Sequence, residues 1–127
     1  MTANNGIVID LPRPPSLNRL WNYGRRKVWK SKVYRRWIDE ADKLLMAGPK
    51  IKGIKGDFRI TMFISGSRKN SDLDNFWKAT MDFLQRVHLI ENDCMCVEQH
   101  AYKVNKSEAP EGMRIFLTAQ EPKVKTV

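Results

Sequence analysis

The chain has 127 residues, of which 23 are Lys or Arg and 14 are Asp or Glu, so its formal net charge is +9; 42% of its residues are hydrophobic. This length suits one domain over residues 1–127 and excludes two large ones, while the composition excludes a disordered or collagen-like chain. No apolar run approaches the roughly 18 residues of a membrane span, and the N-terminus lacks a basic, apolar secretion signal. We therefore expect a cytoplasmic protein with no membrane partner.

The first third of the chain predicts a strand, a second short strand and a helix. Residues 7–11 are an apolar run ended by three prolines, and residues 28–30 resemble a short strand. Ser31 is a candidate N-cap for a helix that runs to about Ala47, where Gly48-Pro49 stops it. Apolar side chains at three- and four-residue spacing predict one buried face on this helix, made of Tyr34, Trp37, Ile38, Ala41, Leu44 and Leu45.

The rest of the chain predicts three strands and a second helix. Residues 57–65 alternate between apolar and polar side chains like a strand, and after a basic loop residues 72–87 show helical periodicity. Residues 94–104 and 113–119 alternate again, and the polar loop between them predicts that they pair as an antiparallel hairpin. The order β(β)αβαββ predicts an α+β (mixed α/β) fold, a single domain with a mixed sheet packed by two main helices and a frayed tail at about 121–127.

The two cysteines, Cys94 and Cys96, lie two residues apart in the predicted strand. Side chains at this spacing share one face at a separation of roughly 7 Å, which is near or beyond the limit for an unstrained disulfide. We expect both to be reduced.

The positive charge is concentrated in one segment. Residues 12–37 contain no acid and hold nine basic residues, so the rest of the chain has as many acidic as basic residues. Aromatic residues alternate with these charges, an arrangement that suits neutralisation of phosphates and stacking on exposed bases. A solvated basic face with its aromatic side chains turned inward is an equally good interpretation. The predicted DNA-binding residues are Arg13, Arg19, Arg25, Arg26, Lys27, Lys30 and Arg35, with Arg68 and Lys69 from the later basic loop.

Acidic residues gather where the basic loop meets the second predicted helix. On this helix Asp74, Lys78 and Asp82 lie one turn apart, opposite its apolar face, and Asp72 comes just before it. Acids in a first turn are commonly helix caps, and a capping-box pairing of Ser71 with Asp74 would explain them without any chemistry. The turn 91–93 supplies a further acid, Asp93, and carboxylates from separated segments suffice for a Mg²⁺ site of the nuclease type.

Other catalytic chemistries find no support in the sequence. His88 and His100 lack partners at metal-ligand spacing, so we expect both to be structural or to face solvent. There is no Gly-rich phosphate loop, no G-x-S-x-G and no H-E-x-x-H motif. The sequence therefore predicts no nucleotide cofactor and neither serine nor zinc hydrolase chemistry.

Two motifs resemble those of the RusA family of phage and bacterial Holliday-junction resolvases, which are small dimeric Mg²⁺-dependent endodeoxyribonucleases. The first is LPRPPSLNRLW at residues 11–21, similar to the family signature LPxPPSxNxxW. The second is DLDNFWKATMDFL at residues 72–84 followed by LIENDCMCV at residues 89–97, similar to D-x-D-N-x-x-K-x-x-x-D-x-L and a later acidic turn. With the order of elements, the resemblance spans most of residues 11–104.

The resemblance implies a role for each matching residue. Asp72, Asp74 and Asp93 correspond to the catalytic carboxylates that bind Mg²⁺, for which Mn²⁺ can substitute, and Lys78 corresponds to the catalytic lysine. The role of Asp82 stays open. The chain departs from the family at two positions, namely Asn92, where aspartate is common, and His88, where glycine is common.

The function expected from the residues and the resemblance together is resolution of Holliday junctions by paired phosphodiester hydrolysis, in a homodimer acting on four-way DNA in a bacterial or phage-infected bacterial cell. One alternative is a nuclease of the same fold that acts on other branched DNA. A second is a non-catalytic DNA-binding recombination accessory protein, in which the acids only cap a helix. Strand nicking that depends on Mg²⁺ separates the nucleases from the accessory protein.

Overall fold

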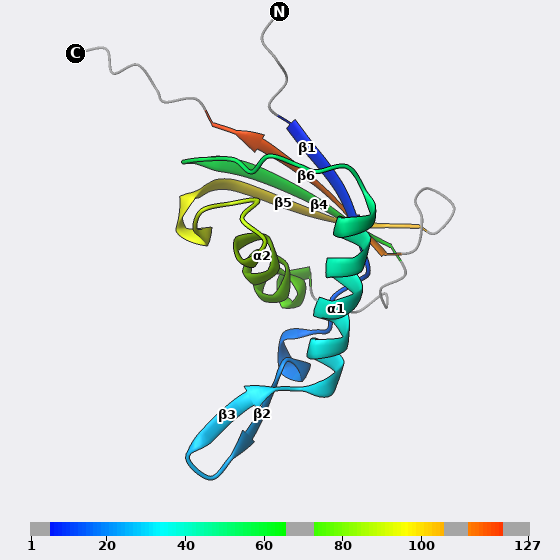
Figure 1. Ribbon diagram of the computed structural model, residues 1–127, viewed down its shortest axis with the longest axis vertical. Coiled ribbons are helices and arrows are strands. Elements are labelled where there is room, and N and C mark those ends of the chain that lie inside the picture. The colour runs from blue at the N-terminus through cyan, green and yellow to red at the C-terminus, as the bar shows by residue number, and fades with distance from the viewer. Residues whose placement is uncertain (1–5, 66–72, 106–111, 121–127) are drawn as a thin grey trace, which may run out of the picture.

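The computed structural model describes residues 6–65, 73–105 and 112–120, which form a four-stranded mixed sheet, two main helices and a separate hairpin (Figure 1). The strands of the sheet are β1 (Gly6–Leu11), β4 (Phe58–Ser65), β5 (Cys96–Val104) and β6 (Gly112–Ala119). The helices are α1 (Lys32–Ala47) and α2 (Trp77–Arg86). The hairpin consists of β2 (Trp21–Gly24) and β3 (Lys27–Lys30), and short 3-10 turns occupy η1 (Leu17–Arg19), η2 (Leu73–Phe76) and η3 (Asp93–Met95). These elements confirm the expected mixed α+β fold.

The sheet order is β1-β6-β4-β5, which corrects one predicted pairing. The strands β5 and β6 do not form an antiparallel hairpin, because β4 lies between them, parallel to β5 and antiparallel to β6. Parallel neighbours need a long crossover, and the segment between β4 and β5, which contains α2, supplies it. Alternation in a strand identifies its buried face and carries no information about its partner, so the sequence of β5 and β6 fitted the wrong pairing equally well.

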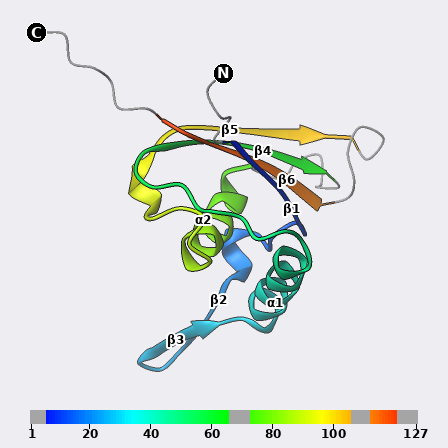
Figure 2. The ribbon, with the colours of Figure 1, turned by 45° about the horizontal axis from the view of Figure 1, so that its top comes forward.

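The core lies between one face of the sheet and the two helices (Figure 2). Alternate side chains of the central strands point to this face, and the register places Ile9 opposite Ile115 and Ile115 opposite Met62. All three side chains are buried. Burial of such apolar area, at roughly 25 cal/mol per Å², is the main stabilising contribution to the fold.

Helix α1 forms where the local sequence predicts it. The Ser31 hydroxyl accepts a hydrogen bond from the Tyr34 N–H at 3.1 Å, as an N-cap does, and the helix ends before Gly48. Tyr34, Trp37, Ile38 and Ala41 are buried as expected and Leu45 is half-buried against the core, whereas Leu44 is 52% exposed.

Helix α2 begins later than its periodicity suggests. The first turn, η2, has 3-10 geometry, and the α-helix starts at Trp77 and ends at Arg86. Phe83 of α2 is buried against Trp37 of α1, with ring centroids 5.5 Å apart. The connection after α2 also differs from expectation, because Cys94 lies in η3 and only Cys96 begins a strand; both cysteines are free thiols.

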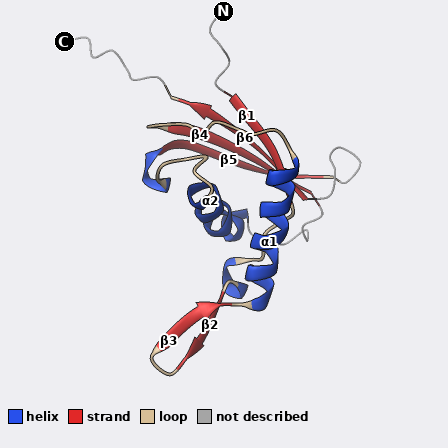
Figure 3. Cartoon of the chain, viewed as in Figure 1, coloured by secondary structure: helices blue, strands red, loops and turns tan. Residues whose placement is uncertain are grey.

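The β2–β3 hairpin extends away from the sheet and helices (Figure 3). The strand β3 was expected, but its partner β2 was not. Both strands are largely exposed, so no buried face produces the alternation that marks a strand. Within the described ranges, no helix is long and apolar enough to cross a membrane.

Candidate active site and nucleic-acid interface

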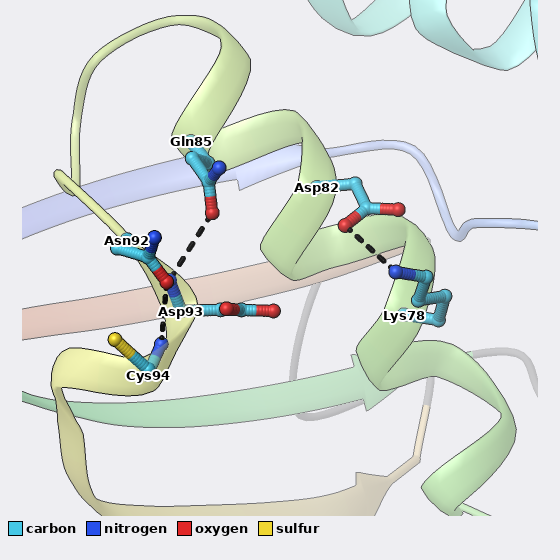
Figure 4. Close-up of polar contacts among 6 residues, drawn as sticks. All are labelled: Lys78, Asp82, Gln85, Asn92, Asp93 and Cys94. Carbon is cyan, nitrogen blue, oxygen red and sulfur yellow. Dashed lines mark hydrogen bonds and ion pairs between the residues drawn. The ribbon is translucent and has the colours of Figure 1, made fainter.

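Helix α2 carries a lysine and an acid that interact directly. The Lys78 Nζ lies 3.2 Å from Asp82 Oδ1, one turn apart on the helix (Figure 4). The Lys78 side chain is half exposed and that of Asp82 one-third exposed. Asp82, whose role the sequence leaves open, thus pairs with Lys78, and their four-residue spacing was a signal for this pair.

Asp93 is held at the other end of α2 by contacts of its backbone. Its N–H donates to Gln85 Oε1 at 3.1 Å, while its exposed carboxylate extends in the direction of Lys78 in the view of Figure 4. No sequence signal indicated Gln85, because this contact depends on how the chain returns after α2. The neighbouring Asn92 caps η3, since its Oδ1 accepts the Cys94 N–H at 3.0 Å.

Asp74 lies in η2, at the opposite end of α2 from the Asp93 contact, and it is exposed. The N-cap position of α2 is Phe76, which makes no side-chain cap hydrogen bond. From Lys78 to Gln85 the helix rises about 10 Å, at 1.5 Å per residue. The Asp93 carboxylate extends along this length toward Lys78, and so toward the end of α2 that follows Asp74 (Figure 4). Ser71 and the predicted site residues Asp72, Arg68 and Lys69 lie outside the described residues.

The chemistry of these acids fits a hard divalent cation. Asp74 and Asp93 offer carboxylate oxygens, and in the described part of the chain neither takes part in a salt bridge. Residues 6–65, 73–105 and 112–120 contain no group of three His, Cys, Asp or Glu side chains that could hold a metal ion. A site built on the predicted triad therefore depends on Asp72, beyond these ranges.

The acidic side chains also influence two nearby groups. Burial raises the pKa of Tyr34 to about 12, and the negative charge of Asp82 adds to the rise. Burial likewise raises the pKa of the Cys96 thiol, with a further contribution from the charge of Asp93. Both effects favour the neutral forms, so the Cys96 side chain remains a thiol at neutral pH.

His88, one of the two departures from the family pattern, is exposed and has a φ of 64°. This left-handed conformation favours glycine, which explains why glycine is suited to the position. The His88 carbonyl also packs so closely on Gly53 that a Cβ there would clash with it. The His100 ring is exposed as well and contacts Glu98 Oε2 at 3.0 Å.

The aromatic residues of the basic segment, residues 12–37, differ in how far they are buried. Tyr34 and Trp37 are buried and Trp21 is half-buried, whereas Tyr23 is 76% and Trp29 42% exposed. Both interpretations of the segment are therefore correct in part, because α1 turns its aromatic side chains inward and the hairpin exposes its own. Seven of the predicted DNA-binding residues lie in the part of the chain that the structure describes, and all seven are exposed: Arg13, Arg19, Arg25, Arg26, Lys27, Lys30 and Arg35.

Two cavities lie beside α1, and each also contacts η2 or α2. The larger, of about 500 Å³, is lined by the proline-rich turn after β1, by Arg19 and Arg36, and by Phe76 of η2. Its wall is fixed by the Trp37 Nε1–H, which donates to the Pro12 carbonyl at 2.8 Å. The second, of about 340 Å³, lies between the base of the hairpin, α1 and the Asp82 side of α2.

The fold and site together define a small α+β protein with a Lys–Asp pair on one helix, an acid in the short turn at each end of that helix, and an exposed basic hairpin. Residues 12–118 match the model of the family Endodeoxyribonuclease RusA. The chain belongs to the RusA family, and this places it among the endodeoxyribonucleases. No curated protein matches the chain closely enough to add a relative to this comparison.

Proposed function

We propose that the protein is a Mg²⁺-dependent, structure-selective endonuclease that resolves Holliday junctions by paired phosphodiester hydrolysis. The observation that carries the proposal is the RusA family match over residues 12–118. It is combined with the location of two motif residues, Asp74 just before α2 and Lys78 on α2. The exposed basic hairpin beside α2 supports a DNA substrate, because phosphate contacts dominate affinity for nucleic acid.

The chain's own residues divide the chemistry between them. Asp72, Asp74 and Asp93 would hold Mg²⁺, with Mn²⁺ as a substitute, and the bound ion supplies an activated water and neutralises charge at the phosphate. Lys78 stabilises the negative charge that develops on the phosphate during hydrolysis, and its contact with Asp82 holds the ammonium in place. Gln85 fixes the backbone at Asp93 and so orients that carboxylate.

Resolution of a junction also implies a second copy of the chain. Two matched nicks are needed on strands of like polarity, and two identical sites related by a twofold axis supply them most simply. We therefore propose a homodimer that acts in the cytoplasm of a bacterial or phage-infected bacterial cell. Sedimentation at micromolar concentration should give about twice the chain mass of 14.8 kDa.

A synthetic four-way junction tests the function directly. Pure protein is incubated with end-labelled junction, with and without Mg²⁺, beside a linear duplex and a flap substrate of the same sequences. We expect symmetric paired nicks in the junction only when Mg²⁺ is present, and none in the duplex. Asp39→Asn is the control variant. It removes the charge of an exposed acid on α1, far along the chain from the motif of residues 72–84, so it should cleave like the wild type.

Three results would contradict the proposal in different ways. Binding without nicking would support the non-catalytic accessory protein. Preferential cutting of the flap would make the protein a nuclease for other branched DNA. Equal cleavage in Mg²⁺ and in excess chelator would mean that the carboxylates do not serve a metal ion.

A further inference from the structure

The two faces of the β2–β3 hairpin differ in how much of their aromatic side chains is exposed to solvent. Cross-strand pairs place Trp21, Tyr23, Val28 and Lys30 on one face and Asn22, Gly24, Lys27 and Trp29 on the other. We call these the Tyr23 face and the Trp29 face. The hairpin extends from the body of the protein (Figure 3), and Trp21 at its base packs against the core.

The Trp29 face is occupied by its own side chains. The Trp29 ring lies over Gly24, where an added Cβ would approach Trp29 Cζ3 to 2.8 Å. The Lys27 ammonium lies over the same ring, 5.6 Å from its centroid, as in a cation–π contact. Trp29 is consequently in contact with the hairpin backbone and with its neighbouring lysine, and it is less exposed than Tyr23, at 42% against 76%.

The Tyr23 face remains open. Tyr23 is 76% exposed and Val28, directly opposite it, is 56% exposed. Toward the body of the protein this face continues through Trp21 and Lys30, which line the cavity of about 340 Å³. The opposite wall of that cavity includes Asp82, the partner of Lys78. A mainly aromatic surface that includes Lys30 therefore leads from the hairpin to the cavity that Asp82 lines.

The turn of the hairpin shows which kind of partner suits this surface. The two turn residues are Arg25 and Arg26, and Arg26 has a φ of 60°, a left-handed conformation that is unfavourable for arginine. Glycine or asparagine is the usual choice at such a position, so the sequence retains a basic side chain there against backbone preference. No acidic residue lies anywhere in residues 12–37, which makes the hairpin complementary to a polyanion.

We propose that the Tyr23 face stacks on bases exposed at the branch point of DNA, while the arginines of the turn contact the adjoining phosphates. Bases within an intact duplex hide their faces by stacking on one another, whereas a branch point exposes the faces of its last pairs. Tyr23 then recognises the branch, and Arg25 contributes affinity for any DNA. This inference rests on the proposed function and assigns the recognition of its substrate to one face of one hairpin.

The test compares Tyr23→Ala with Tyr23→Phe, which keeps the ring, and with Tyr102→Ala, which removes a 48% exposed tyrosine from the sheet. Binding to a four-way junction and to a linear duplex is measured in chelator, so that no strand is cut. The junction carries 2-aminopurine beside the branch point as a fluorescent report of stacking. We expect Tyr23→Ala to weaken junction binding about tenfold and to abolish the fluorescence change, with duplex binding altered less than twofold.

The controls separate stacking from charge. Tyr23→Phe and Tyr102→Ala should behave like the wild type, while Arg25→Gln should weaken junction and duplex binding alike. If Tyr23→Ala lost affinity for junction and duplex equally, the stacking role would be overturned. It would also be overturned if this variant gave the same 2-aminopurine fluorescence change as the wild type. A shift of Tyr23→Ala from dimer to monomer in sedimentation, with junction binding per dimer unchanged, would make this face a contact between copies and would also overturn the inference.

Cleavage by the wild type in Mg²⁺ is scored with the same DNA. A wild type that cuts the junction, together with a Tyr23→Ala variant of unaltered selectivity, rejects only the stacking surface. A wild type that never cuts rejects the proposed function, whatever the hairpin variants do. The two failures are therefore distinguishable.

Discussion

The β2–β3 hairpin and helix α2 meet at one cavity but present very different surfaces. The hairpin is exposed apart from Trp21 at its base, with basic and aromatic side chains and no acid. The α2 region pairs its lysine with an acid and has Asp74 and Asp93 at its two ends, on a helix whose other side is buried in the core. If the proposed function is right, this difference assigns affinity for DNA and hydrolysis of DNA to separate elements. Under the proposed function, each can be removed by mutation while the other is retained.

The largest expected effect is that of Asp74→Asn, which keeps the size of the side chain and removes its charge. Cleavage of a four-way junction should fall by about 10²-fold or more, because one oxygen ligand of the metal loses its charge. Binding in chelator should be equal to that of the wild type or tighter, since an exposed negative charge near the phosphates is gone. Single-turnover cleavage and gel-shift titration measure the two quantities.

Asp39→Asn is the matched control for this variant and should leave both quantities unchanged. If Asp74 serves only to stabilise the start of the helix, the pattern reverses. Activity would then persist while the free energy of unfolding falls by about 0.5–2 kcal/mol.

Mutations of the two members of the Lys78–Asp82 pair should lower the cleavage rate by unequal amounts. Lys78→Ala removes the charge that stabilises the developing phosphate negative charge and should lower the cleavage rate by about 10²-fold. Asp82→Asn leaves that charge and removes only a partly exposed partner, so the rate should fall by about fivefold or less. A double-mutant cycle on single-turnover rates checks this, and equal losses in the two single variants would show that Asp82 has a direct role of its own.

The difference between local and non-local information explains which parts of these two regions were predictable from the sequence. The capping serine, apolar spacing and Gly48-Pro49 stop of α1 are all local signals, and the helix has the predicted bounds. The Lys78–Asp82 pair follows from one turn of helix in the same way. The β5–β6 pairing was wrong and the Gln85–Asp93 contact was missed, because both depend on how distant segments return to the sheet.

The hairpin was missed in part for another physical reason. A strand is recognised from sequence when one face is buried, and in β2 only Trp21 packs against the core, so Trp21–Gly24 shows no clear alternation. The concentration of charge in residues 12–37 was visible in the sequence. Which aromatic residues remain exposed was not visible, since that depends on where α1 packs.

A smaller effect is expected for Arg25→Glu at the tip of the hairpin. Binding to junction and duplex should both weaken, and the slope of log K against log salt should fall by roughly 0.9 for each phosphate that the protein no longer neutralises. The cleavage rate at saturating protein should change little, because the acids and the lysine of the α2 region are intact. Titrations at several salt concentrations measure the slope, and Asp39→Lys, which changes charge by the same amount in the opposite sense, is the reference variant. An unchanged slope would place Arg25 away from the DNA.

The smallest expected effect concerns Ser31, which joins the hairpin to the core. Its hydroxyl donates to the Arg19 carbonyl at 2.6 Å and accepts the Tyr34 N–H at 3.1 Å, so one side chain ties the 3-10 turn before the hairpin to the start of α1. Ser31→Ala breaks both bonds and should lower the free energy of unfolding by about 1 kcal/mol, or Tm by about 4 °C. Ser31→Thr retains a hydroxyl and should lose less than half as much. Both variants should cleave the junction normally well below Tm, because the site residues of the α2 region are untouched. A loss of junction binding in Ser31→Ala without any loss of thermal stability would show that the hairpin and the α2 region are coupled through this serine, which would contradict their separation.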